Sequence, residues 1–240
     1  MMFVQSGRFA GGGGGGDPHW GSVMLLCGFD GADGSTTMTD ESLAGHTLSV
    51  FGNAQLDTGV APPFGTSSLL LDGSGDDVFA ADSADWAFGS GDFTIELFAR
   101  PRINNLNRGL ISQYASSGSQ LAWEIYCSND DLSCRVSANG TTATVFTTTS
   151  DAFTAAAWHH VCFERASTKL RIYIDGVMRG STTSFGSNSV FDSNLNMTIG
   201  GRDDSDKFDG HIKEVRITKG VARYNNDAGF TAPTAAFPRS

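Results

Sequence analysis

The stretch Leu-Arg-Ile-Tyr-Ile-Asp-Gly at residues 170–176 decides the fold class. Its three aliphatic side chains alternate with Arg171 and Tyr173. Because successive side chains of a β-strand point to opposite faces, this alternation predicts a β-strand with its aliphatic residues on one face. Asp175-Gly176 then separates this run from a second β-rich run at 177–184, and Asp-Gly in that position predicts a hairpin turn.

Short β-rich runs of this kind recur from Trp20 onward, separated by Gly, Asn, Asp and Ser clusters that favour turns. The predicted strands are 23–29, 68–71, 93–100, 109–113, 121–127, 134–138, 142–148, 158–165, 170–174, 177–184, 195–199 and 208–218. Within the last of these, Ile212 falls on one face and Val215 and Ile217 on the other, which predicts a bulge or bend. Residues 82–88 suggest one short helical turn. The pattern as a whole predicts a single antiparallel β-sandwich.

Size and charge narrow the class of protein. A chain of 240 residues can bury a sizeable core as one large all-β domain. The formal net charge is -10, and an acidic chain repels phosphate backbones, so we expect no nucleic-acid partner. The apolar run at 23–27 is too short to cross a bilayer, and nothing near the N-terminus has the pattern of a secretion signal. We therefore expect no membrane partner.

Composition divides the chain into three parts. Residues 1–19 contain six consecutive glycines at 11–16, which cannot hold a helix or packed strand by themselves. This glycine-rich arm is either a flexible tail or an anchor that becomes ordered against a partner. Residues 20–225 form the predicted sandwich, and residues 226–240 form a C-terminal extension.

Several motifs resemble laminin-G-like domains of the concanavalin A-like lectin and glucanase type. They are Gly28-Phe-Asp-Gly31, Gly45-His-Thr47, Ser68-Leu-Leu-Leu-Asp-Gly73, Gly91-Asp-Phe-Thr-Ile-Glu96, Trp158-His-His-Val161, Leu170-Arg-Ile-Tyr-Ile-Asp-Gly176, Thr198-Ile-Gly-Gly201 and Phe208-Asp-Gly-His-Ile-Lys-Glu-Val-Arg-Ile217. They occur in the family's order over residues 22–225. The resemblance implies a jelly-roll β-sandwich. It also implies that Trp158, His159 and His160 are a fold signature, and His46 and His211 read as structural for similar reasons.

A narrower resemblance concerns the ends of the chain. Asp17-Pro-His-Trp20, Lys219-Gly-Val-Ala-Arg-Tyr224 and the segment 230–238 resemble virion proteins of tailed bacteriophages. This likeness implies a non-enzymatic virion structural protein, on the capsid or tail, that is assembled in the host cytoplasm. The arm would contact other virion proteins, the sandwich would bind glycans or host-surface ligands, and we expect a homo-oligomer. An alternative is a capsid decoration protein, in which the sandwich stabilises neighbouring capsid subunits.

A degenerate carbohydrate-active enzyme is a further alternative. Glucanases of this fold carry two catalytic carboxylates on one strand, in the pattern Glu-x-Asp-x-x-Glu, because one carboxylate attacks the sugar and the other transfers the proton. That pattern is absent from the chain. Each strand glutamate stands alone among non-acidic neighbours, at Glu96, Glu124, Glu164 and Glu214. We therefore expect no enzymatic activity.

Calcium is the one cofactor that the resemblance implies. Relatives often hold Ca²⁺ through an Asp near the first strand, a backbone carbonyl and an acid in the last strand, and hard oxygen ligands suit this ion. The matching residues here are Asp30, Asp72, Gly73 and Glu214. Lys213 stands where many relatives have Asp, so an ion pair could replace the cation.

Other features allow two readings each. The acidic stretch 202–206 with Asp209 is either a solvated loop or a rim cation site. For sugar stacking the candidates are Trp123, Tyr126 and Tyr114 with the loop 104–107, although strand aromatics are more often core. Cys127 and Cys134 could form a disulfide across a hairpin; alternatively all four cysteines, Cys27 and Cys162 included, are small buried residues.

Overall fold

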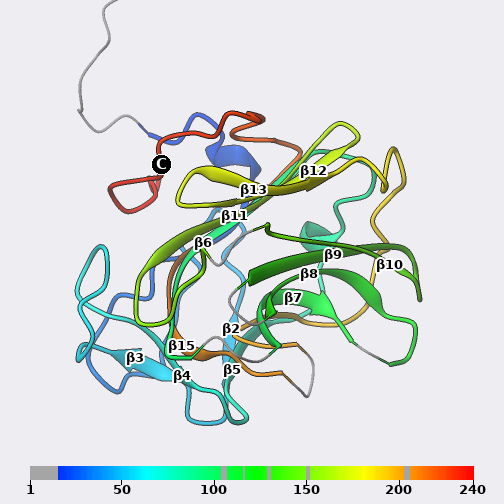
Figure 1. The fold of residues 1–240 in the computed structure, drawn as a ribbon. Coiled ribbons are helices and arrows are strands. Elements are labelled where there is room, and N and C mark those ends of the chain that lie inside the picture. The colour runs from blue at the N-terminus through cyan, green and yellow to red at the C-terminus, as the bar shows by residue number, and fades with distance from the viewer. Residues whose placement is uncertain (1–15, 104–106, 116, 129–130, 150–151, 203–205) are drawn as a thin grey trace, which may run out of the picture.

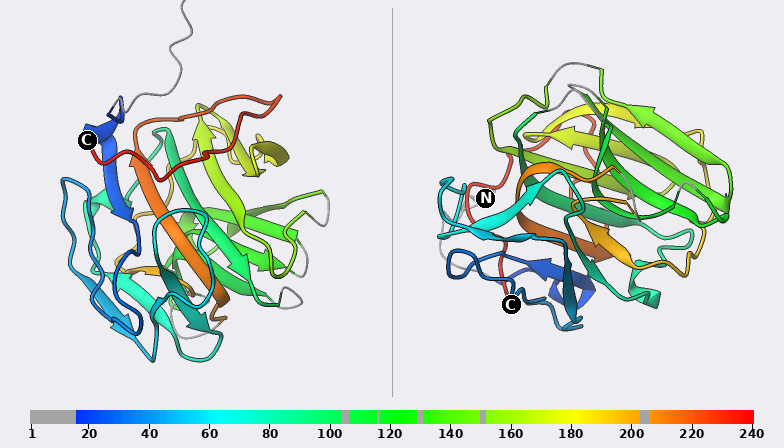
Figure 2. Two further views of the ribbon diagram at one scale, coloured as in Figure 1. Left: turned by 90° about the vertical axis from the view of Figure 1, so that its left-hand side faces the viewer. Right: turned by 90° about the horizontal axis from the view of Figure 1, so that it is seen from below.

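A computed structural model describes residues 16–103, 107–115, 117–128, 131–149, 152–202 and 206–240. Two antiparallel sheets pack face to face in it (Figure 1), and the two layers separate clearly when the molecule is seen from below (Figure 2). This arrangement confirms the predicted β-sandwich and is consistent with a jelly roll. No helix among these residues is both long enough and apolar enough to span a membrane.

Eight strands form the first sheet, sheet A. Its order is β13 (Val177–Thr182), β12 (Lys169–Ile174), β11 (His159–Ala166), β6 (Phe93–Pro101), β15 (Asp209–Lys219), β4 (Ser68–Asp72) and β3 (Gln55–Asp57). The eighth strand, β1 (Val23–Cys27), pairs with the second half of β15, whereas β4 pairs with the first half. β15 therefore pairs with three strands of this sheet, β1, β4 and β6.

The other sheet, sheet B, has seven strands. Its order is β10 (Ala143–Thr147), β9 (Asp131–Gly140), β8 (Leu121–Ser128), β7 (Arg108–Tyr114), β14 (Met197–Ile199), β5 (Asp77–Ala80) and β2 (Leu48–Phe51). Two short 3-10 helices, η1 (Trp20–Ser22) and η2 (Ala84–Trp86), complete the elements, and η2 lies within the predicted helical turn. The strands β2, β3 and β5 were absent from the sequence prediction.

Two local predictions are confirmed. Asp175 and Gly176 join β12 to β13 with φ of 53° and 77°, the positive values that a tight hairpin turn requires. The register of β15 against β6 shifts between Lys213 and Arg216, and Glu214 lies at the shift with φ of 52°. This bulge keeps the aliphatic residues on both sides of it in the core.

A single large apolar cluster fills the space between the sheets. Its largest fully buried aromatic side chains are Trp86, Trp123, Phe93, Phe153, Phe163 and Phe208. All four cysteines are buried and carry free thiols. Cys127 lies opposite Leu132, and Cys134 lies opposite Ile125, so the two thiols do not face each other across the β8–β9 hairpin. The structure supports the reading in which all four are small buried residues.

The C-terminal segment, residues 221–240, runs across the outer face of sheet A, where it is the red chain end in the left view of Figure 2. Phe237 of this segment is 2% exposed and packs with Phe98 of β6 in a second, smaller apolar cluster. Near the other end of the chain, the Asp17 carboxylate pairs with Arg216 and Arg223. Most of the predicted arm, residues 1–15, lies outside the described residues.

Candidate functional site

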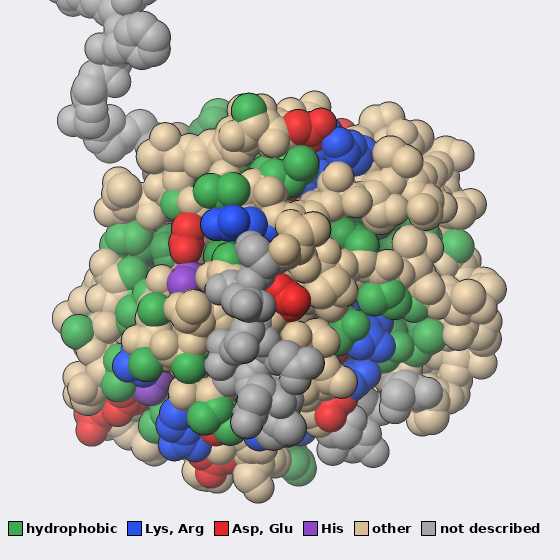
Figure 3. Space-filling view, viewed as in Figure 1, with side chains coloured by type: hydrophobic (Ala, Val, Ile, Leu, Met, Phe, Trp, Pro, Cys, Tyr) green, Lys and Arg blue, Asp and Glu red, His purple; other side chains and the backbone are tan. Residues whose placement is uncertain are grey.

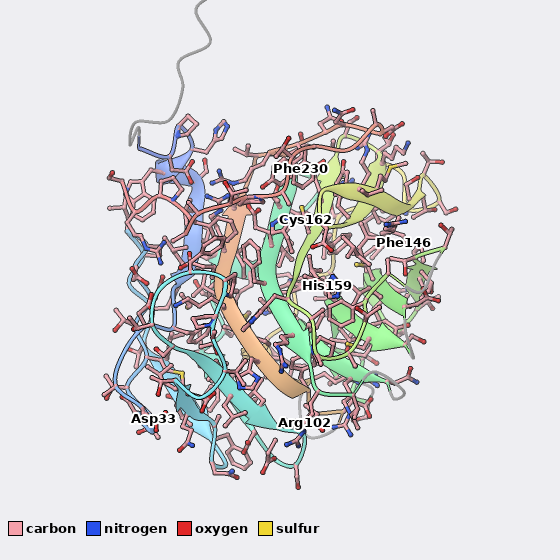
Figure 4. The ribbon with its side chains drawn as sticks, turned by 60° about the vertical axis from the view of Figure 1, so that its left-hand side comes forward. Asp33, Arg102, Phe146, His159, Cys162 and Phe230 are labelled. Atoms are coloured by element: carbon pink, nitrogen blue, oxygen red, sulfur yellow. The ribbon has the colours of Figure 1, made fainter. Side chains whose placement is uncertain are left out.

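The two outer faces of the sandwich differ in what covers them. On sheet A, Tyr224, Phe230 and Phe237 of the C-terminal segment lie over the polar residues of the strands, and Tyr224 and Phe230 stack with ring centroids 3.5 Å apart. Figure 4 shows Phe230 at the top of this face. A cavity on the outer face of sheet B has no lining residue from this segment. The candidate site therefore lies on sheet B.

One row of side chains crosses the outer face of sheet B from strand to strand. Neighbouring members of the row are directly opposite each other in the register, and the row runs Ser49, Phe79, Thr198, Ser112, Glu124, Arg135 and Val145. Near its β2–β5 end the row carries the apolar Phe79, and on β8 and β9 it carries the charged Glu124 and Arg135. Cross-strand neighbours of this kind lie within contact distance, so the row forms one continuous surface.

A cavity of about 540 Å³ lies at the β2–β5 end of this row. Phe51 is 59% exposed and borders the cavity together with the half-buried Phe79. Asn194 and Asn196, in the segment that leads into β14, contribute amide groups, and Tyr114 closes the side toward β7. The cavity thus combines aromatic surface with hydrogen-bonding amides, as small-molecule sites commonly do.

The charged groups that border this cavity neutralise each other. The Lys207 ammonium lies 2.5 Å from a carboxylate oxygen of Asp77, and both residues are buried. An ion pair made within the protein leaves no free charge for a ligand to satisfy. The lining therefore favours an uncharged polar ligand.

An ion pair with a fully buried carboxylate lies farther along the row, on β8 and β9. The Arg135 guanidinium nitrogen Nε lies 2.9 Å from Glu124 Oε2, and the Arg135 guanidinium stacks over the Tyr126 ring at 3.9 Å. Burial raises the pKa of Glu124, although Arg135 and Arg202 oppose that rise. Tyr114 accepts a hydrogen bond from Arg135 and so links this pair to the cavity.

The predicted sugar-stacking residues have other partners. Trp123 is fully buried in the core and donates its indole N–H to the Trp86 carbonyl. Tyr114 and Tyr126 are each 7% exposed, because their rings are covered by Arg135. Only Tyr114 of the three borders the cavity. Residues 104–106 of the predicted loop lie outside the described part of the chain.

The four predicted calcium ligands do not converge. Asp30 accepts the Thr66 N–H just before β4, whereas Asp72 and Gly73 lie at the far end of that strand, roughly 13 Å away at 3.3 Å per residue. Ligands of one calcium ion must all lie within about 2.6 Å of it. Asp72 and Gly73 therefore cannot share an ion with Asp30.

Basic side chains already neutralise the two remaining candidates. The Lys213 ammonium lies 2.7 Å from Asp30 Oδ1, which is the ion pair that the sequence suggested. Arg239 donates to both carboxylate oxygens of Glu214. No group of three or more His, Cys, Asp or Glu side chains in the described residues could hold a metal ion. The residues present do not fit a calcium ion.

Other polar residues singled out from the sequence also have partners within the protein. Asp209 pairs with Arg102 at 2.7 Å, and Arg202 pairs with Asp206; residues 203–205 between them are outside the described part. His159 pairs with Asp175, and His160 pairs with Glu96. His46 lies 3.0 Å from Asp85.

Each strand glutamate is engaged by a different group. Glu96 binds Arg216, Glu124 binds Arg135, and Glu214 binds Arg239. Glu164 accepts the backbone N–H groups of Tyr224 and Asn225. These interactions place the carboxylates in separate environments.

Sequence reasoning missed Phe51 and Phe79, which carry the aromatic part of the cavity. Both lie on strands that were not predicted, and each is the single aromatic residue of a four-residue strand. Phe51 is exposed beside Phe79 at the cavity, and adjoining exposed apolar surface of this kind can mark a ligand-binding groove. Such exposure can be read only from the fold.

Comparisons with known proteins agree with this fold. A family model described as "Concanavalin A-like lectin/glucanases superfamily" matches residues 72–223. No curated protein matches the chain.

Solved structures with a similar fold include toxin domains. The binding domain of Paraclostridial Mosquitocidal Protein 1 is 16% identical, with a TM-score of 0.65 over 84% of this chain and 50% of that one. The receptor binding domain of botulinum neurotoxin C/D mosaic serotype is 13% identical, with a TM-score of 0.65 over 85% and 49%. The botulinum neurotoxin serotype D ligand binding domain, in complex with N-acetylneuraminic acid, is 14% identical, with a TM-score of 0.65 over 85% and 49%.

This chain spans about half the length of those toxin domains, and identities this low show the fold alone. The family model, in contrast, matches well over half of the 240 residues, including strands of both sheets. The predicted family is confirmed: the chain belongs to the concanavalin A-like lectin/glucanase superfamily.

Proposed function

We propose that this chain is a non-enzymatic, lectin-like module that binds a glycan in the cavity on the outer face of sheet B. One observation carries the proposal: the exposed Phe51 and half-buried Phe79 share this cavity of about 540 Å³ with the amides of Asn194 and Asn196. Sugar rings present C–H groups on their faces and hydroxyls at their edges. Aromatic rings suit the faces, and amides can both donate to and accept from the hydroxyls.

The ligand we expect is an uncharged saccharide, because Asp77 and Lys207 neutralise each other at the cavity wall. The cavity volume falls within the range typical of small-molecule sites. The botulinum neurotoxin serotype D ligand binding domain, about half of which shares this fold, has been solved in complex with N-acetylneuraminic acid.

A glycan array followed by calorimetry with the best ligand tests this proposal. Phe51→Ala is expected to lower the affinity about tenfold or more, since a buried aromatic contact contributes on the order of 1.5–3 kcal/mol. Leu43→Ala is the matched control, because Leu43 is 72% exposed and does not border the cavity. Equal loss in both variants, or no array signal at all, would contradict the proposal.

Absence of catalysis is tested separately. The wild-type protein is incubated with a panel of β-glucans, and reducing ends are measured. We expect no hydrolysis, since the strand glutamates are individually engaged. Measurable hydrolysis would contradict this expectation. Substituting the carboxylates one at a time would then identify the catalytic residue by the loss of turnover.

We further propose display on a tailed-bacteriophage particle, on the capsid or tail, after assembly in the host cytoplasm. This proposal rests on the terminal motifs, whose residues Asp17, Arg223 and Phe237 also have packing roles on sheet A. Mass spectrometry and electron microscopy of purified particles test it. Density at a tail tip or fibre supports host adhesion, density on the shell supports a decoration role, and absence from particles rejects both.

A further inference from the structure

A second cavity, of about 320 Å³, lies on the outer face of sheet A. It is bordered by Val60, Leu70, Arg100, Arg102 and His211, together with Asp57 and Asp209. None of its lining residues belongs to the C-terminal segment, which covers the other part of this face. In Figure 3, basic, acidic and histidine side chains lie close together at the lower left, where Figure 1 places β3 and β4. Figure 4 shows Arg102 at the lower end of this face.

Arg100 projects into this region from β6. Its neighbour Ala99 is in the core, so the Arg100 side chain belongs to the outer face. Arg100 lies directly opposite His211 of β15, which in turn lies opposite Leu70 of β4. These three side chains therefore form a cross-strand row along the cavity floor.

The guanidinium of Arg100 has no ion pair or hydrogen bond with any described residue. Nearly every other described basic side chain has a partner: Arg102 pairs with Asp209, Lys213 with Asp30, and even Lys219 donates to the Ala84 carbonyl. Arg100 is partly exposed. An unpaired guanidinium inside a cavity is the kind of group that a ligand satisfies.

The two carboxylates at this cavity do not compensate Arg100. Asp57 is engaged by His211 at 3.1 Å and by the Val60 N–H at 3.1 Å. Asp209 is engaged by Arg102 at 2.7 Å. Burial is the main cause that lowers the pKa of His211; Arg100 and Arg102 lower it further, and Asp57 opposes them.

We propose that this cavity binds a small organic anion, whose carboxylate or sulfate group pairs with Arg100 while its carbon skeleton lies against Leu70 and Val60. A planar guanidinium can donate two parallel hydrogen bonds to a carboxylate, which gives orientation as well as affinity. The apolar floor supplies contact for a ring or short chain. A sugar acid has both parts and matches the size of the cavity. This site is separate from the glycan cavity, because it lies on the opposite sheet.

Calorimetry with glucuronate, glucose and inorganic sulfate tests the proposal on the full chain. We expect glucuronate to bind and glucose to fail. Arg100→Gln is expected to weaken glucuronate binding by about tenfold or more, because it removes hydrogen bonds to a charged group. Lys169→Gln is the matched control: it removes one positive charge from the same sheet, at a residue that pairs with Asp227 outside the cavity.

A second variant, at a different residue of the cavity, keeps the test informative if Arg100→Gln does not fold. Val60→Glu adds a carboxylate at the cavity edge, where it can pair with Arg100, and is expected to abolish glucuronate binding. As an independent readout, NMR titration of His211 should show a higher pKa when glucuronate is present, because the bound anion offsets the neighbouring guanidinium charge.

The possible outcomes separate cleanly. Loss in both cavity variants with retention in Lys169→Gln supports the site. Equal loss in Arg100→Gln and Lys169→Gln shows a nonspecific charge effect and overturns it, as do unchanged binding by Arg100→Gln and failure of both anions to bind. Phe51→Ala should leave glucuronate binding intact, so failure of the glycan cavity and failure of this site are distinguishable.

Discussion

The ammonium of Lys213 lies 2.7 Å from Asp30 Oδ1, and the Lys213 side chain is completely buried. A fixed positive charge thus stands beside the residue that would otherwise be the first ligand of a calcium ion. Asp30 also accepts the Thr66 N–H, so the pair ties the loop after β1 to the start of β4. The Lys213 ammonium therefore takes the place beside Asp30 that a metal cation would need.

We therefore expect calcium and chelators to have no effect on the wild-type protein. The melting temperature should be the same with added CaCl₂ or with EDTA. Lys213→Asp should lower the melting temperature in EDTA, because two carboxylates then face each other, and added calcium should restore part of the loss. A wild-type melting temperature that falls in EDTA would contradict this account.

Stability at acidic pH should depend on Glu96. Burial alone would raise the pKa of Glu96, but Arg216, His160 and Tyr224 outweigh it and lower the pKa to about 2 from 4.5. A lowered folded-state pKa contributes stability that is present above the unfolded-state pKa and lost as the pH falls. Glu96 should thus supply on the order of 3 kcal/mol above about pH 4.5, lost toward pH 2.

Urea unfolding at several pH values checks this dependence. Glu96→Gln should be much less stable than wild type at pH 7, and its free energy of unfolding should change less between pH 5 and pH 3. Burial is the main cause that raises the pKa of Glu164, which gives a slope of the opposite sign. Identical pH profiles for the two proteins would refute the role of Glu96.

Anchoring of the C-terminal segment should depend on Phe237. Its ring packs against Phe98 and lies 4.0 Å from the Arg216 guanidinium, and its amide N–H donates to Glu214. Phe237→Ala should lower the free energy of unfolding by about 3 kcal/mol and should expose the segment to protease. The exposed Leu43→Ala should change stability by less than about 0.5 kcal/mol. A Phe237→Ala protein as stable as that control would rule out the anchor.

All four cysteine thiols should be unreactive in the folded protein. Each is buried, and burial raises the pKa of Cys27, Cys127, Cys134 and Cys162, which suppresses the nucleophilic thiolate. Titration with a thiol reagent should find no fast-reacting group before denaturation and four after it. Two reactive groups after denaturation without reductant would indicate a disulfide within the chain.

Much of the sandwich could be predicted from local sequence. The alternation in 170–174 and the Asp175-Gly176 turn need no distant partner to define them, and both appear in the structure as predicted. The bulge near Glu214 was likewise visible as a break in the alternation. Local patterns of this kind are reliable because strand and turn geometry depend on neighbouring residues alone.

The candidate site could not be predicted in the same way. Phe51 and Phe79 come together with Asn194 only because β2, β5 and β14 are neighbours in sheet B, and no local pattern encodes that order. Tyr114 and Tyr126 were plausible sugar-stacking residues, but Arg135, which lies opposite Glu124 in the register, covers their rings. Asp30 and Asp72 were assigned to one ion although β4 separates them. Each difference comes from contacts between distant strands.

The bulge in β15 separates two roles within one strand. Without Glu214 the local sequence would be Ile212-Lys-Val-Arg-Ile217, an uninterrupted alternation with the same three aliphatic residues facing the core. Glu214 is thus an added residue, and its carboxylate holds Phe237 and Arg239 of the C-terminal segment. Glu214 attaches the C-terminal segment, whereas Ile212, Val215 and Ile217 pack in the core. A substitution of Glu214 can therefore release the segment while the core stays packed.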